Sequence, residues 1–112
     1  MSLENRRGQR RKTLLAGIVV YGKNARFCNC MIRSLSSTGA SLRLRDQQVT
    51  GDSFYLLEVA RGLAYEAKLV WSKKQDIGVT LSLPIDLRTD VHPRFERIRR
   101  IWLSTTHGTS DL

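Results

Sequence analysis

Five cationic side chains lie close together near the start of the chain, in the segment Arg6-Arg7-Gly8-Gln9-Arg10-Arg11-Lys12. An arginine side chain is a planar fork that can donate two parallel hydrogen bonds to a phosphate and can stack on a base. Because isolated charge is costly to remove from water, this cluster is either a solvated tail or a clamp for an anion. The net charge of +9 also indicates an anionic partner, without identifying it.

A second polar stretch, Ser34-Leu35-Ser36-Ser37-Thr38-Gly39, follows downstream of the basic cluster. Small hydroxyl residues closed by a glycine are typical of a turn. The hydroxyl of Ser36 could serve a ligand or the backbone, and Gly39 is expected to supply a positive φ that the turn requires. The alternative for both residues is an ordinary turn without a ligand.

No pattern typical of catalysis is present in the sequence: it has no acid/base pair, no Ser/His/Asp set and no phosphate-cradling Gly-rich loop. His92 precedes a proline at an expected helix start, which favours a capping role. Cys28 and Cys30 would share one face of a strand, and we expect them to be reduced core residues, because zinc would need two more suitably spaced ligands. The sequence therefore predicts a binding protein, with no catalytic residues, no cofactor and no metal site.

Short apolar segments separated by polar turns predict strands over residues 14–21, 25–34, 40–44, 53–59, 64–73 and 77–81. In the fifth of these, Ala67, Leu69 and Trp71 are expected to share one face. Short strands at this spacing favour an antiparallel barrel or sandwich. No βαβ unit and no internal repeat is visible.

The end of the chain has a different pattern. An irregular segment from Pro84 to Val91 leads to Pro93, which is well placed for the first turn of a helix. Apolar residues then recur at three- and four-residue spacing and form a stripe that is expected to pack on the barrel: Phe95, Ile98, Ile101 and Trp102. The arginines on the other sides of this helix form either a solvated face or a binding surface.

These patterns predict four regions in one domain of 112 residues. They are a flexible basic segment over 1–12, a β-barrel over 13–83, a linker with the helix over 84–105, and a disordered tail over 106–112. No segment reaches the ~20 apolar residues that span a bilayer, and no signal-peptide pattern follows the start. A cytoplasmic location is therefore expected.

The two polar stretches together resemble the signature of the PilZ domain, a family of bacterial receptors for cyclic di-GMP. That signature is Arg-x-x-x-Arg near the N-terminus, followed by Asp or Asn-x-Ser-x-x-Gly at the end of a strand. Residues 64–71 and 77–81 also look like the family's later strands, so the resemblance covers about residues 5–82. The residues that would bind the ligand are Arg6 with Arg10 or Arg7 with Arg11, together with Ser34, Ser36 and Gly39.

The resemblance implies a six-stranded antiparallel Greek-key β-barrel with a C-terminal α-helix packed on it, and it implies cyclic di-GMP as the ligand. Arginines on a flexible segment could wrap the dinucleotide against the barrel and become ordered only on binding. Such ordering would change the surface presented to a downstream protein. The sequence identifies neither this partner nor the oligomeric state.

Ser34 departs from the family pattern, which has Asp or Asn at this position. A carboxylate accepts two hydrogen bonds from the Watson–Crick edge of guanine, and a hydroxyl cannot reproduce that pairing. Losing a bidentate base contact costs about 1–3 kcal/mol, or roughly ten- to a hundred-fold in affinity. This departure motivates an alternative function, a degenerate PilZ module that binds nucleotide weakly or not at all and acts as a protein-interaction adaptor.

A nucleic-acid-binding small β-barrel is a further alternative, motivated by the net charge. Barrels of this kind usually present aromatic side chains as stacking platforms. The aromatic residues mostly fall on expected core faces, which argues against nucleic acid as the partner: Phe27, Trp71, Phe95 and Trp102.

Overall fold

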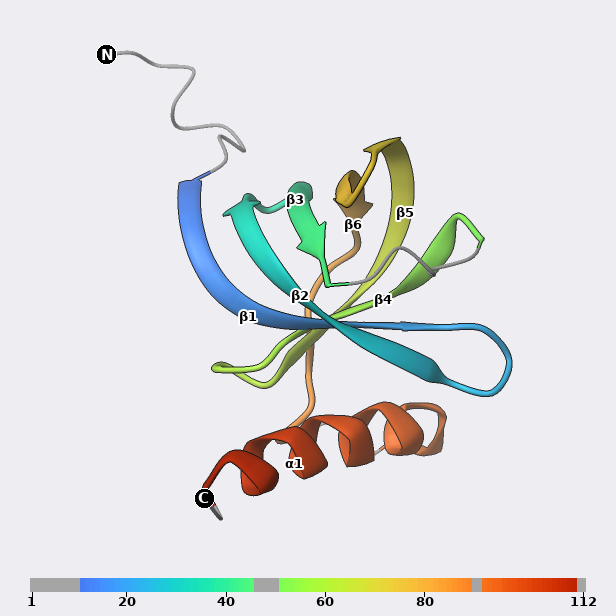
Figure 1. Ribbon diagram of the computed structural model, residues 1–112. Helices are drawn as coiled ribbons and strands as arrows, with labels where there is room; N and C mark the ends of the chain where they lie inside the picture. Colours follow the sequence, from blue (N-terminus) through green and yellow to red (C-terminus); the bar gives the residue numbers. More distant parts are fainter. Residues whose placement is uncertain (1–10, 46–50, 90–91, 111–112) are drawn as a thin grey trace.

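The computed structural model describes the chain over residues 11–45, 51–89 and 92–110, and its side chains over 14–45, 51–89 and 92–105. Its central feature is one antiparallel sheet that curls into a barrel (Figure 1). The six main strands are β1 (Arg11–Tyr21), β2 (Arg26–Leu35), β3 (Gly39–Leu44), β4 (Ser53–Glu58), β5 (Leu63–Lys73) and β6 (Asp76–Leu81).

Strand pairing closes the barrel. The order around it is β1-β2-β3-β6-β5-β4, and β4 pairs back onto β1. Closure leaves the six strands without an unpaired edge. A two-residue strand, β7 (Ile85–Asp86), adds to β5 inside the segment that was expected to be irregular. The predicted six-stranded antiparallel barrel with a C-terminal helix is confirmed, and β7 is an addition to it.

The inside of the barrel is filled by residues that alternate along the strands, and the two cysteines are among them. Cys28 and Cys30 are both buried and form no disulfide, as predicted. Burial raises the pKa of the Cys30 thiol from its ordinary value of 9.0 to about 12, and the neighbouring Cys28 adds to the rise. A thiol that stays protonated is a poor nucleophile, so Cys30 serves the core.

A second apolar cluster lies outside the barrel and is covered by the C-terminal elements, η2 (Pro93–Phe95) and α1 (Glu96–Ser110). Phe95 and Ile98 are buried there, as the apolar stripe predicts. His92 caps the start, where its Nδ1 accepts a hydrogen bond from the Arg94 amide at 3.1 Å. The helix continues to Ser110, beyond the end at residue 105 that the sequence indicates.

Two contacts fix the far part of the helix to the β4–β5 turn and the segment after β7. The indole Nε1 of Trp102 donates to the carbonyl of Val59 at 2.8 Å, and Nε of Arg99 donates to the carbonyl of Leu87 at 2.8 Å. The Trp102 ring lies against Gly62, where a Cβ would come within 2.7 Å of ring atom Cζ2. Gly62 also has a φ of +65°, so this turn requires glycine on two grounds.

A carboxylate is buried at the end of β4. Glu58 is only 2% exposed. Both of its oxygens accept from Arg61, from Nε at 2.6 Å and from the second nitrogen at 2.8 Å, and the Tyr65 hydroxyl lies 3.4 Å away. A buried charge is tolerated when it is paired and hydrogen-bonded, and Arg61 supplies both.

Replacement of Arg61 is expected to destabilise the barrel. Arg61→Ala leaves the Glu58 carboxylate buried without its charged partner, which should lower the free energy of unfolding by about 1–2 kcal/mol after allowance for the solvent-exposed guanidinium. Urea denaturation measures the change. Arg43→Ala is the matched control, because its ion pair with Asp76 is exposed on the surface. Equal losses for the two variants would contradict the buried-charge argument.

The buried thiols make a prediction about alkaline pH. Since the pKa of Cys30 is raised in the folded state, its contribution to stability is complete below the unfolded thiol's pKa near 9 and is lost as pH rises toward about 12. Cys30→Ala should therefore flatten the fall in unfolding free energy over this window. Denaturant titrations from pH 8 to 11 test it. A fall as steep as that of the wild type would show that other groups are responsible.

Candidate functional site

Register shifts interrupt three strands of the barrel. They occur in β1 after residue 12, in β2 after residue 32 and in β5 after residue 69. A bulge places one or more extra residues on one strand and re-aims the side chains that follow it. The shifts lie on three strands that contribute to one side of the barrel, across β1, β2, β3, β6 and β5.

The bulge in β2 turns Ser34 outward. Ile32 is fully buried, and regular alternation would send Ser34 into the core as well. Arg33 is the extra residue, so Ser34 pairs with Ser41, which lies between two inward-facing residues of β3. The two hydroxyl oxygens are 2.6 Å apart. This polar pair is half-buried on the outer surface.

The bulge in β5 turns Trp71 outward too. The prediction that Trp71 shares a face with Leu69 is wrong, because Val70 is an extra residue and Trp71 pairs with Gly78 of β6. The Trp71 side chain is 42% exposed. A Cβ on Gly78 would lie within 2.7 Å of indole atom Cδ1, so the ring occupies the place where a side chain of β6 would stand.

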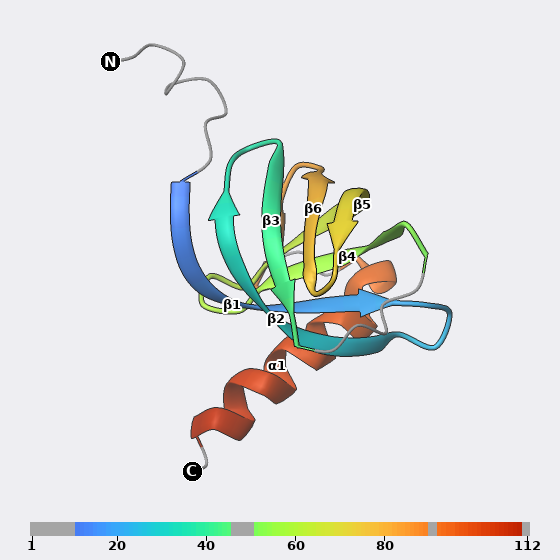
Figure 2. The same cartoon turned by 45° about the horizontal axis from the view of Figure 1, so that its top comes forward.

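Cross-strand pairing joins these positions into a line across β1, β2, β3, β6 and β5, which lie side by side in Figure 2. Directly paired residues point to the same face of a sheet and have Cβ atoms about 5 Å apart. We call this line the outer row; in order, its members are Ser34, Ser41, Gly78 and Trp71, and the backbone of Lys12 pairs with Ser34 at the β1 end of the row.

The connection between β2 and β3 is a serine-capped turn. The Ser36 hydroxyl accepts from the amide N–H groups of Thr38 at 3.2 Å and Gly39 at 3.1 Å, and the Ser36 amide donates to the Gly39 carbonyl at 2.8 Å. The hydroxyl is thus engaged by the backbone. The expected positive φ at Gly39 is wrong, because β3 begins there and Gly39 is in extended backbone paired with Thr80.

Of the four predicted arginines, the structure describes the backbone of one. Arg6, Arg7 and Arg10 lie outside the described residues. Arg11 is the first residue of β1, and its backbone pairs with Leu35. The register therefore brings the end of the basic cluster beside the Ser34–Gly39 stretch, although the two are far apart in sequence.

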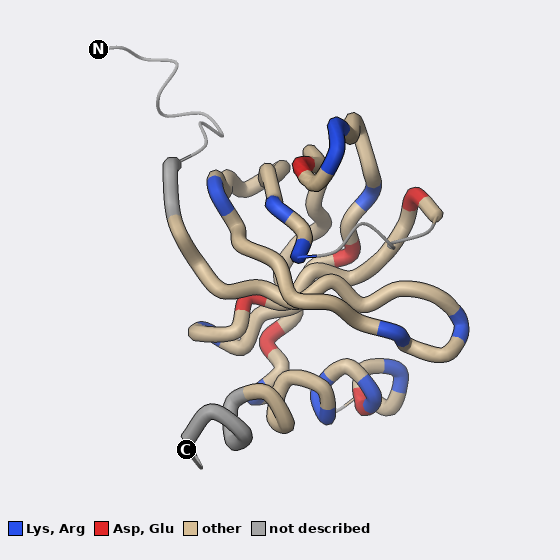
Figure 3. Tube along the Cα trace, viewed as in Figure 1, with Lys and Arg blue, Asp and Glu red and all other residues tan. Residues whose placement is uncertain are grey.

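Positive charge surrounds the outer row. Figure 3 shows Lys and Arg along the upper parts of β2, β3 and β5. Arg43 forms a two-point pair with Asp76, at 2.9 and 3.0 Å. This hydrogen bonding holds the pKa of Asp76 below its ordinary value, and the charges of Arg33 and Lys73 lower it further. The only acid of this group is thus ionised and surrounded by cations, and such a surface attracts anions.

The part of the chain that the structure describes holds neither a metal-ligand cluster nor a membrane-spanning helix. No group of three or more His, Cys, Asp or Glu residues there could hold a metal ion. None of the helices described is long and apolar enough to cross a membrane.

A protein-family model matches most of the chain. The family model of the PilZ domain matches residues 4–100, which span the basic cluster, the whole barrel and the first part of α1. No curated protein matches the chain significantly.

The packing of Trp71 on Gly78 can be tested by a double-mutant cycle. Gly78→Ala should lower the free energy of unfolding by about 1–3 kcal/mol, because the new methyl group collides with the indole. In a Trp71→Ala background the same change should cost much less, since the space is empty. Denaturation of the four proteins in urea gives the coupling. An equal loss in both backgrounds would contradict this contact.

Proposed function

The chain belongs to the PilZ domain family, a family of cyclic di-GMP receptors, and on this basis we propose that it binds cyclic di-GMP across the outer row. The observation that carries the proposal is the register of β1 against β2. It sets the backbone of Arg11 and Lys12 next to Leu35 and Ser34, which supports a site built from the Arg-x-x-x-Arg pattern together with the Ser-x-Ser-x-x-Gly pattern.

In this proposal the basic segment supplies the charge that binds the two phosphates. Either Arg6 with Arg10 or Arg7 with Arg11 closes over the dinucleotide, because guanidinium forks match phosphate oxygens and the Hoogsteen edge of guanine. Closure brings the N-terminal arginine segment onto the barrel surface and changes what a downstream protein contacts. Ser36 and Gly39 act by holding the β2–β3 turn in shape beside the ligand.

Trp71 adds a contribution that the motif does not contain. Its half-exposed indole stands three strands away from Ser34 on the same row, where a guanine can stack on it. Stacking on an aromatic side chain is worth about 1–3 kcal/mol per base. With Ser34 in place of Asp or Asn, the site lacks a bidentate contact to guanine, whose binding free energy is of similar size, about 1–3 kcal/mol. We propose that stacking on Trp71 offsets this loss.

The degenerate adaptor remains the second candidate, and one observation favours it. The hydroxyls of Ser34 and Ser41 already bond each other at 2.6 Å, so a guanine edge must compete with this pair. Nucleic acid has less support. Phe27 and Trp71 are exposed, contrary to expectation. Phe27 is the second residue of β2, at the end far from the outer row, so the two do not form one stacking platform.

Calorimetric titration with cyclic di-GMP tests the proposal. The wild type should bind, and Ser34→Asp should bind roughly ten- to a hundred-fold tighter because a carboxylate restores the bidentate contact. Arg7→Ala and Arg10→Ala, measured separately, should identify the register in use, since only one of them should abolish binding. Arg88→Ala, an exposed arginine away from the outer row, is the control.

The outcomes separate the two candidates. Binding by Ser34→Asp but not by the wild type would favour the degenerate adaptor. Absence of heat for both proteins up to high micromolar ligand at low salt would contradict nucleotide binding altogether.

A further inference from the structure

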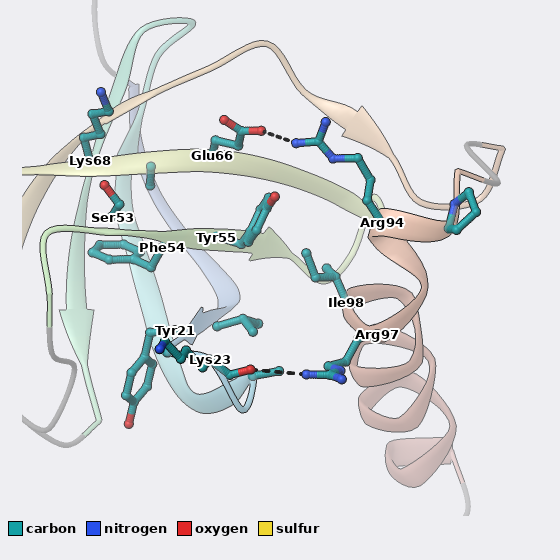
Figure 4. A pocket seen from close by; sticks show the side chains of 15 residues that line it. Tyr21, Lys23, Ser53, Phe54, Tyr55, Glu66, Lys68, Arg94, Arg97 and Ile98 are labelled. Carbon is teal, nitrogen blue, oxygen red and sulfur yellow. Dashed lines mark hydrogen bonds and ion pairs between the residues drawn. The ribbon is translucent and has the colours of Figure 1, made fainter.

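A cavity of about 540 Å³ lies outside the barrel, at the other end of β1 and β2 from the outer row. Its walls are the β1–β2 turn, the outer face of β4 and β5, and the first turns of the C-terminal helix (Figure 4). Pockets that bind small molecules usually have volumes of about 300–1,000 Å³, so this cavity has room for a large side chain. None of the outer-row residues lines this cavity.

The interior of the cavity is apolar. Val20 comes from β1, Tyr55 from β4 and Ile98 from α1. Tyr55 is held in place by an edge-on contact with Phe95, with ring centroids 6.4 Å apart and planes at 87°. The cavity therefore offers a shaped apolar surface that is suited to a large side chain.

The mouth of the cavity is cationic. Four positively charged residues line it, and all four are exposed: Lys23, Lys68, Arg94 and Arg97. Arg97 is oriented by a hydrogen bond to the Lys23 carbonyl at 3.4 Å, and Arg94 lies over the Phe95 ring at 5.0 Å. Glu66 is the one acid among the lining residues, and it pairs with Arg94 at 3.3 Å.

We propose that this cavity binds an acidic segment of a partner protein, which inserts one aromatic or large aliphatic side chain between Tyr55 and Ile98 and places carboxylates on the surrounding cations. An apolar anchor enclosed by a charged rim is the common anatomy of a protein interface. The inference goes beyond the nucleotide site and does not depend on it.

The charge of the chain argues against two other occupants. A second copy carries a net charge of +9 and would be repelled at this mouth. The chain's own basic segment, Arg6–Lys12, has the same sign. A continuous nucleic acid strand fits poorly, because the apolar interior offers no room for successive phosphates but does suit a single side chain.

Replacement of Glu66 should raise the affinity for an acidic peptide, whereas replacement of a cation at the mouth should lower it. In the free protein the Glu66 carboxylate forms an ion pair with Arg94, so a carboxylate of the partner must displace Glu66. Glu66→Gln removes this competitor and one negative charge at the mouth. Acidic peptides should then bind tighter, which a purely structural role of Glu66 would not produce.

Fluorescence anisotropy with a labelled peptide, Asp-Glu-Asp-Trp-Glu-Asp, tests the site on the full chain at low salt. Saturable one-to-one binding is expected. Arg97→Glu should weaken it about tenfold, and Glu66→Gln should tighten it about threefold. Arg100→Glu is the matched control: it makes the same charge change on an exposed arginine of the same helix that does not line the cavity. It should leave affinity within about twofold.

Three results would overturn the proposal. The first is no saturation by millimolar peptide, and the second is equal weakening of peptide binding by Arg97→Glu and Arg100→Glu. The third is that ATP displaces the labelled peptide at lower concentration than unlabelled peptide does, which would indicate a nucleotide pocket. A peptide with Gly in place of Trp should bind at least several-fold more weakly if the anchor enters the cavity. Cyclic di-GMP titrated into the same variants should show unchanged affinity, so failure of one site leaves the other testable.

Discussion

The structure depends on the antiparallel pairing of β1, which is bonded to β2 on one side and to β4 on the other. This double pairing closes the barrel, and closure fixes the register of the remaining strands because each must meet its neighbour without a free edge. It also separates two surfaces. The start of β1 brings the backbone of Arg11 and Lys12 beside the outer row, and its end carries Val20 to the apolar cluster under the helix.

In a closed barrel, every second residue of a regular strand points inward. A side chain at one of these inward positions can point outward only if a bulge shifts the alternation. The shifts after residue 32 and residue 69 do this for Ser34 and Trp71. Both residues would otherwise be in the core, where a hydroxyl lacks a partner and an indole lacks space. The local irregularity of the strands is thus what creates the candidate site.

Much of the fold could be predicted from the sequence, because alternation in Ala40–Leu44 and the helical stripe from Phe95 report burial directly. The bulges could not be predicted, since one extra residue leaves no mark on composition. Gly78, a glycine inside a strand pattern, is a feature that could have indicated a close approach. Gly39 was assigned a positive φ from its turn-like neighbours, but Ser36 closes that turn through hydrogen bonds and β3 starts earlier than expected. The cavity beside the helix is lined by segments that are far apart in sequence, so no local pattern could have revealed it.

The central claim is that the outer row forms half of a cyclic di-GMP site which the N-terminal arginines complete. An NMR titration of isotope-labelled protein with cyclic di-GMP tests it most directly. The account predicts that the Trp71 indole N–H and the amides of residues 34–39 shift together, along with those of the basic segment. Shifts confined to Tyr55 and Arg97 at the other end of the barrel, or no shifts at all, would contradict it.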